Sequence, residues 1–200
     1  KGRKPAEISC DVSRAEAHML RATSDAVMVA SGTVLADDPM LNCRLPGMAD
    51  RSPIRVALDG NLRVPLGAKL VRTARKIPFW IITRPDAPPD KQRELENAGV
   101  EVMRVNTAGK RIDLSDALHL LATRNITRLL VEGGPIISAE LLRENLIDEA
   151  VIVQSPKELG ADAIPALEGM ALSALLENPR FDVVERRALG PDRLTHLFRS

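Results

Sequence analysis

The sequence Val131-Glu132-Gly133-Gly134-Pro135 carries the strongest structural signal in the chain. Residues 128–131 before it predict a buried strand, and residues 135–145 have the apolar periodicity of an amphipathic helix. The two glycines let the main chain turn tightly between them. A proline suits the first helical turn, because its missing N–H group would have no partner there in any case. A strand, a tight turn and a helix are therefore predicted in immediate succession.

The same alternation extends in both directions along the chain. Further strands are expected at residues 26–30, 54–58, 79–83, 100–105 and 149–154, and residues 181–188 and 193–199 are expected to pair antiparallel. Helices are expected at residues 13–22, 88–98, 114–124 and 170–176, with Ser13 capping the first of them and Gly99 ending the second. The sequence thus predicts one α/β domain: a mostly parallel central sheet, helices on both of its faces, and an antiparallel C-terminal edge pair.

The composition excludes several classes of protein. The 200 residues contain 28 basic and 27 acidic side chains, a net charge of +1, which lacks the basic excess of an electrostatic nucleic-acid binder. No apolar run is long enough to span a bilayer. The two cysteines, Cys10 and Cys43, cannot form a disulfide framework and fit a reducing cytoplasm. We expect neither nucleic acid nor a membrane among the partners.

The Gly133-Gly134 turn is a candidate ligand site, because free N–H groups at a helix start favour phosphates at the mouth of a parallel sheet. An ordinary tight turn is the alternative. Glu132 ends the strand at this point, and a carboxylate there must be solvated, paired or hydrogen-bonded. A ligand group and a salt bridge to an arginine are equally compatible with it.

A second cluster follows the strand at residues 26–30. Thr33 is expected to cap a short helical turn, with Asp37 on the same side one turn later. On the local pattern alone, a cap and a turn without ligand are the favoured explanation. The neighbouring Asp38 should point away and no histidine is near in sequence, so no metal site is predicted. The three histidines of the chain, His18 included, show no ligand spacing.

Arg21 and Arg44 each follow an apolar stretch that leads toward these turns. Guanidinium groups bind phosphates in a bidentate manner, so a phosphorylated substrate is one explanation. The alternative explanation is that both arginines are ordinary surface residues.

Taken together, these pieces resemble the reductase domain of riboflavin biosynthesis, the half that follows the deaminase in the bifunctional deaminase–reductase. Two motifs carry the resemblance in this order and spacing: Gly32-Thr33-Val34-Leu35-Ala36-Asp37-Asp38-Pro39 and Leu130-Val131-Glu132-Gly133-Gly134-Pro135. Shorter matches lie at residues 18–22, 53–59, 62–65, 146–149 and 156–160.

The resemblance implies a dihydrofolate-reductase-like fold, NADPH as hydride donor, a homodimer, and reduction of the ribosyl group of 5-amino-6-(5-phosphoribosylamino)uracil. It places substrate against Arg21, Leu41, Arg44 and Glu132. It places the cofactor against Thr33, Asp37, Gly60, Gly133, Gly134, Pro135, Ile136, Ile137 and Ser138. Asp37, Glu132 or a bound water would relay the proton. Arg63 and Arg84, after strand ends, are candidates for the 2′-phosphate of NADPH.

Two departures from the family pattern bear on these expectations. Gly60 stands where the family commonly has a serine. The family also opens with a strand carrying a Ser-x-Asp-Gly element, which would lie before Lys1. Residues 1–200 are thus expected to be a single reductase domain without its first strand or an upstream deaminase domain, and with weak cofactor binding if that strand is absent. A same-fold reductase of another pteridine- or pyrimidine-like substrate and a non-catalytic nucleotide-binding relative remain alternatives.

Overall fold

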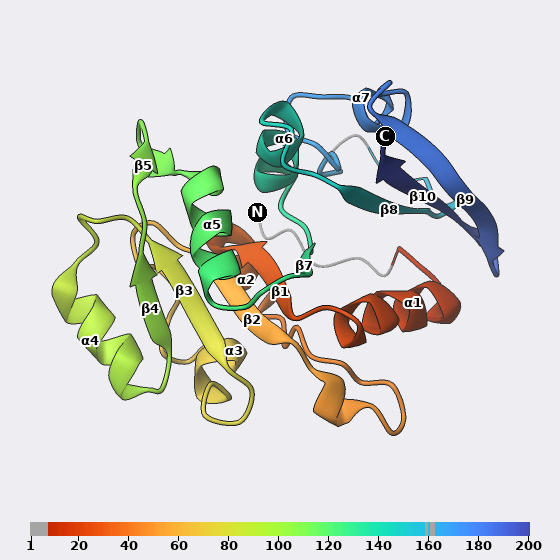
Figure 1. The fold of residues 1–200 in the computed structure, drawn as a ribbon. Coiled ribbons are helices and arrows are strands. Elements are labelled where there is room, and N and C mark those ends of the chain that lie inside the picture. The colour runs from red at the N-terminus through yellow and green to blue at the C-terminus, as the bar shows by residue number, and fades with distance from the viewer. Residues whose placement is uncertain (1–7, 159, 161–162) are drawn as a thin grey trace. The chain divides into compact units, whose positions relative to one another are not determined.

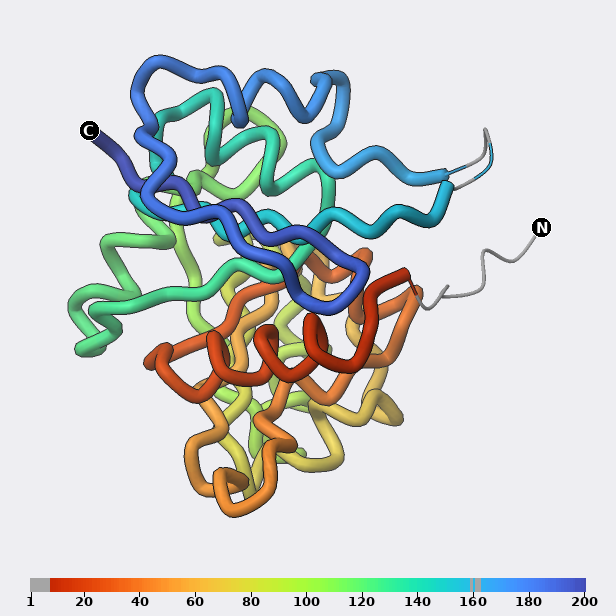
Figure 2. Tube along the Cα trace, turned by 90° about the vertical axis from the view of Figure 1, so that its right-hand side faces the viewer, coloured from red at the N-terminus to blue at the C-terminus, as the bar shows by residue number. Residues whose placement is uncertain are grey.

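The computed structural model describes residues 8–158, 160 and 163–200, shown in Figures 1 and 2. The chain divides into two compact units. One unit is residues 18–133, and the other combines residues 134–200 with the chain up to Ala17. The expectation of one reductase domain over residues 1–200 stays a prediction, because two units within one chain are compatible with it.

A five-stranded parallel sheet forms the centre of the unit of residues 18–133. Its order is β4-β3-β2-β1-β7, and every neighbouring pair runs parallel (Figure 1). The strands are β1 (Ala26–Ala30), β2 (Ile54–Leu58), β3 (Phe79–Thr83), β4 (Glu101–Arg104) and β7 (Leu129–Val131). The first three have the bounds that their apolar runs predict; β2 and β3 end at turn residues, and β1 leads directly into the helix that starts at Ser31.

Helices cover both faces of this sheet. They are α2 (Ser31–Asp37), α3 (Lys69–Arg72), α4 (Pro89–Asn97) and α5 (Leu114–Thr123), with a 3-10 turn η1 (Ala49–Arg51) and a small hairpin β5 (Thr107–Ala108) and β6 (Arg111–Ile112). Val27 and Ile81 share one core cluster with side chains of α2, α3 and α4. Met28 and Ile82 point the other way and are equally buried, and Figure 1 shows α5 crossing the face turned to the viewer.

An antiparallel sheet forms the second unit. It consists of β8 (Glu149–Gln154), β10 (Asp192–Arg199) and β9 (Phe181–Leu189), in that order, so β8 joins the predicted hairpin as a third strand. Helix α6 (Pro135–Arg143) packs on it through Ala139 and Leu142, and the short α7 (Ser173–Leu176) adds Leu175 to the same core. The expected α/β class, with its parallel sheet and antiparallel C-terminal strands, is confirmed.

Helix α1 (Asp11–Ala22) contributes residues to both units, and its start corrects one expectation. Ser13 does not cap the helix, which begins two residues earlier; its hydroxyl instead donates to Asp192 Oδ2 at 2.6 Å. The same oxygen accepts from Cys10 N at 2.8 Å. A carboxylate from the far end of the chain thus satisfies the helix start, which local spacing does not reveal.

Candidate functional site

The carboxyl ends of β1, β2 and β7 lie along one edge of the parallel sheet, where open α/β sheets bind ligands. Within the unit of residues 18–133, α2, Asp59 and Glu132 follow these three strand ends. The side chains at this edge therefore form the candidate functional site.

Glu132 is paired with Arg21. Arg21 Nε donates to Glu132 Oε1 and Arg21 Nη2 to Oε2, both at 2.5 Å, and the side chains are 14% and 23% exposed. Arg21 Nη1 also donates to Asn42 O at 3.1 Å. Of the two roles that the sequence left open for Glu132, the structure contains the salt bridge, and it fixes the carboxylate in one orientation.

His18 lies one helical turn before Arg21 and reaches the same segment. Its Nδ1 is 3.1 Å from Asn42 O and 3.3 Å from Arg44 N. The pKa of His18 is lowered, because burial removes the ring from water and the positive charges of Arg21 and Arg44 lie nearby. Sequence reasoning missed this residue; the three-residue spacing of His18 and Arg21 in one helix was the only available signal.

Arg44 is exposed to solvent. The one hydrogen bond of this guanidinium found within the described residues runs from Nη1 to Asn42 Oδ1 at 3.2 Å. The structure thus brings Arg21, Arg44 and Glu132 together, as the substrate-binding expectation requires. The remaining N–H groups of Arg44 are available to an anion.

Leu41 is placed differently from Arg44. Its side chain is 3% exposed and belongs to the core cluster of the sheet, and its φ is +51°. A branched residue with positive φ is strained by about 1–3 kcal/mol. Any contact of Leu41 with a ligand therefore passes through its main chain.

Thr33 and Asp37 lie one turn apart on α2. Thr33 is inside the helix and does not cap it, because the helix begins at Ser31 and Ala30 takes the position before it. Thr33 is half-buried and Asp37 exposed. Neither side chain has a hydrogen bond or an ion pair within the described residues, so both are available to a ligand.

Gly60 lies in the loop after β2 and contacts Arg84. A Cβ on Gly60 would come within 3.1 Å of Arg84 Cγ, and Arg84 donates to Gly60 O and to Asn61 Oδ1 at 3.3 and 2.6 Å. The absence of a side chain at Gly60 thus leaves room for Arg84.

Arg63 joins the same loop to the start of α2. Its Nη2 donates to Ser31 Oγ at 2.8 Å, and its side chain is 57% exposed. Its Nε is 3.8 Å from Oδ1 of the fully buried Asp59, too far for a hydrogen bond. Arg63 therefore has N–H groups to offer to a ligand at this edge.

The glycine turn leads from one unit into the other. Gly133 has φ +74° and Gly134 φ +97°, conformations that glycine alone adopts readily. Pro135 starts α6 as predicted, and Ser138 N donates to Gly134 O at 3.1 Å.

The N–H groups of Ile136 and Ile137 are at the helix start, where no earlier turn supplies acceptors. The Ile137 side chain is buried and that of Ile136 is half exposed. A ligand at this turn would thus meet the main chain and the exposed part of the Ile136 side chain.

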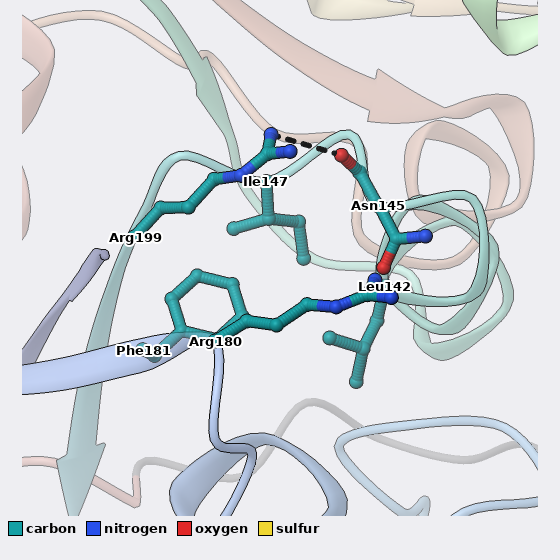
Figure 3. A pocket seen from close by; sticks show the side chains of 6 residues that line it. All are labelled: Leu142, Asn145, Ile147, Arg180, Phe181 and Arg199. Carbon is teal, nitrogen blue, oxygen red and sulfur yellow. Dashed lines mark hydrogen bonds between the residues drawn. The ribbon is translucent and has the colours of Figure 1, made fainter.

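Two pockets lined by described residues of the second unit contain none of these candidates. The smaller, of about 10 Å³, holds little more than one water molecule (Figure 3). Its lining residues are Leu142, Asn145, Ile147, Arg180, Phe181 and Arg199, with Arg199 Nη1 donating to Asn145 O at 3.2 Å. The larger, of about 530 Å³, lies at the turn between β9 and β10.

The described residues hold no group of three or more His, Cys, Asp or Glu side chains that would bind a metal ion. None of the described helices has the length and apolar character needed to cross a membrane.

Comparison with known proteins adds a family to this geometry. Residues 1–195 match the family described as the RibD C-terminal domain. The chain is 34% identical over 198 residues to the 2,5-diamino-6-ribosylamino-4(3H)-pyrimidinone 5′-phosphate reductase of Archaeoglobus fulgidus, covering 94% of this chain and 86% of that protein. It is 35% identical over 188 residues to riboflavin biosynthesis protein RibD of Actinobacillus pleuropneumoniae, covering 94% of this chain and 49% of that protein.

A solved structure of a RibD protein also matches this chain. Form 2 of RibD from Acinetobacter baumannii aligns with a TM-score of 0.78 at 26% identity and covers 100% of this chain and 55% of that one. The chain thus spans about half the length of the RibD proteins that it matches. The resemblance drawn from the two sequence motifs and the reductase fold that it implied are confirmed.

Proposed function

Because this chain belongs to the RibD C-terminal domain family, we propose that it reduces the ribosyl group of a phosphoribosylaminopyrimidine, 5-amino-6-(5-phosphoribosylamino)uracil, with NADPH as the hydride donor. The observation that carries the proposal is the joint placement of Arg21, Glu132 and Arg44 at the carboxyl edge of the parallel sheet. These residues offer a fixed carboxylate and an available guanidinium to a substrate that has a polar ring at one end and a phosphate at the other.

Arg44 binds the substrate phosphate in this proposal. Its guanidinium is exposed and carries one weak hydrogen bond, so binding a phosphate costs little rearrangement. Arg21 donates three hydrogen bonds to Glu132 and Asn42 and keeps two further N–H groups for the ligand. Leu41 contributes main-chain contact beside them.

Glu132 orients the substrate and does not supply the proton. Both of its oxygens already accept hydrogen bonds from Arg21, which commits the carboxylate to an orienting role. Asp37 is exposed and unpaired within the described residues, so it is the better candidate for moving a proton, directly or through a bound water.

The cofactor supplies the hydride when bound, and this chain supplies position and exclusion of water. Thr33 and Asp37 offer unpaired side chains to it, and the half-buried Gly60 would meet it beside Arg84. Gly133 leaves open space at its Cβ position, and the N–H groups of Ile136 and Ile137 suit phosphate oxygens. Gly134, Pro135 and Ser138 complete that turn.

Arg63, exposed beside Ser31, is the candidate for the 2′-phosphate that distinguishes NADPH from NADH.

The protein is also proposed to be a cytoplasmic homodimer, as the family resemblance implies. Size-exclusion chromatography with light scattering tests the dimer. A mass of one chain across the micromolar range would refute it.

A turnover experiment tests the proposed function. Purified protein is mixed with NADPH and the phosphoribosylaminouracil, and absorbance at the nicotinamide band is followed. One NADPH oxidised per substrate supports the proposal. The diamino pyrimidinone in the name of the archaeal relative is tested as a second substrate. Faster turnover of this compound would indicate that the protein reduces the pyrimidine before it is deaminated. Turnover of dihydrofolate instead would indicate another reductase, and saturable NADPH binding without turnover a non-catalytic relative.

A further inference from the structure

His18 contacts the segment that carries Arg44 but does not belong to the residues expected to meet substrate. Its Nδ1 lies between Asn42 O and Arg44 N, at 3.1 and 3.3 Å. A neutral imidazole uses Nδ1 either to donate to the carbonyl or to accept from the N–H group, and both bonds anchor the same three residues.

The segment of residues 42–44 has few other anchors. The Cys43 side chain is 1% exposed in the core, and its N–H group donates to Ser52 Oγ at 3.1 Å. Arg21 Nη1 donates to Asn42 O at 3.1 Å. His18 supplies the contact at the Arg44 end, so the direction in which the Arg44 side chain leaves the main chain depends on it.

The charges around His18 keep the ring in the form that makes this contact. Burial and the charges of Arg21 and Arg44 lower its pKa, while the Asn42 carbonyl and the Glu132 carboxylate act in the opposite direction. The net effect is a neutral ring at pH 7, which does not repel an adjacent arginine.

We propose that His18 is a positioning residue, which fixes residues 42–44 so that Arg44 presents its guanidinium to a phosphate of the ligand. This inference rests on the phosphate-binding role given to Arg44 in the proposed function. His18 itself touches neither phosphate nor the reacting carbon in this account, and it acts through Arg44.

The chain offers closely matched variants for a test. His18→Asn keeps a polar atom near the position of Nδ1, whereas His18→Ala removes it. His119→Ala, at an exposed position on α5, controls for loss of a histidine elsewhere in the same unit. Thermal unfolding of each variant checks that the fold is retained.

Binding of ribose 5-phosphate to the purified protein, measured by calorimetry, gives a readout that does not depend on turnover. We expect His18→Ala and Arg44→Ala each to weaken it about 10-fold, which corresponds to about 1.4 kcal/mol. His18→Asn should retain most of the affinity, and His119→Ala all of it. The double variant should bind no more weakly than Arg44→Ala alone, because His18 acts through Arg44.

Turnover then separates positioning from a general structural role. With the phosphorylated substrate, His18→Ala should raise KM about 10-fold while kcat changes far less, and KM for the dephosphorylated ribosyl compound should not change. An equal rise in KM for both substrates would overturn the proposal. So would effects of His18→Ala and Arg44→Ala on binding affinity that add up in the double variant, or an affinity for ribose 5-phosphate that neither substitution changes. Phosphate binding with the expected pattern but no turnover by the wild type would instead refute the proposed function and leave the role of His18 intact.

Discussion

Arg21 holds both carboxylate oxygens of Glu132 at 2.5 Å, although 111 residues separate the two in sequence. The pair connects α1 to the end of β7 within the unit of residues 18–133. Its consequence is a carboxylate that is held in one place before any substrate arrives, which is the arrangement that preorganised electrostatic catalysis requires.

Glu132→Gln should therefore reduce turnover far more than cofactor binding. The amide keeps the shape but loses the charge, and its NH2 group would face the N–H donors of Arg21. We expect kcat to fall at least about 100-fold, the scale of losing one group that stabilises a transition state. The dissociation constant of NADPH, from a fluorescence titration, should stay within about threefold. Glu144→Gln, at an exposed position, is the control. Equal losses in turnover and NADPH binding would contradict the role given to Glu132.

Arg63→Ala should weaken NADPH binding and leave NADH binding unchanged. The Arg63 side chain is 57% exposed, and its N–H groups other than the one that donates to Ser31 Oγ can bind a 2′-phosphate. Losing a hydrogen bond to a charged group costs about 1.5–3 kcal/mol, which predicts an increase of about 10-fold or more in KM for NADPH. Steady-state kinetics with both cofactors measure this ratio, and Arg72→Ala on α3 is the matched arginine control. A parallel increase for NADH would assign Arg63 to the fold of the loop instead.

Asp25 should give the protein an acid-sensitive contact between the starts of β1 and β7. Its Oδ2 accepts hydrogen bonds from Arg128 N, Thr127 Oγ1 and Thr127 N, each at 2.8 Å. These bonds, with the Arg128 N–H first, lower the pKa of Asp25 from 3.8. The unfolded chain then takes up the proton first as pH falls, so the stabilisation is present above pH 3.8 and is lost below it.

Urea unfolding at pH 7 and pH 3 checks this expectation. Asp25→Ala should lower the free energy of unfolding at pH 7, and the gap to wild type should narrow at pH 3. Asp50→Ala, at an exposed position in η1, serves as the control. A gap of the same size at both values would show that the Asp25 charge does not contribute to stability.

Arg55 is the fully buried charge of the central sheet and should be costly to replace. Burial lowers its pKa to about 10, so it remains charged at neutral pH. It donates to Thr73 Oγ1 at 2.7 Å, to Pro78 O and Leu70 O at 3.4 Å, and to Ile77 O. Arg55→Met would remove the side-chain donors to these acceptors, at a cost of about 2–4 kcal/mol in the free energy of unfolding. Equal urea midpoints for Arg55→Met and wild type would refute this expectation; Arg51→Ala, at an exposed position, is the control.

The elements of this protein were predictable where local chemistry decides them. Strands β1, β2, β3 and β8 have the predicted bounds, and β2 and β3 have them because each is a largely apolar run that ends at a turn residue. The start of α1 was not predictable, since Asp192 satisfies it from a position 179 residues away from Ser13.

In the candidate site, too, the sequence predicted single residues but not their long-range contacts. The motifs indicated Glu132 and Arg21 separately, but only the folded chain reveals that they are partners. The role of His18 depends on a loop more than twenty residues further along the chain, so no spacing rule within the helix identifies it. Long-range pairing, and not local propensity, is the part of this fold that the sequence does not disclose.

The backbone conformation at Gly133 and Gly134 limits which substitutions these two positions accept. Two adjacent residues with φ of +74° and +97° disfavour every side chain at both positions, whether or not a ligand ever visits the turn. Invariance of these glycines among relatives would therefore report the geometry of the bend. A selective pressure that comes from a bound molecule would instead be visible at Ile136, where the helical backbone accepts almost any residue and the half-exposed side chain is otherwise free to vary.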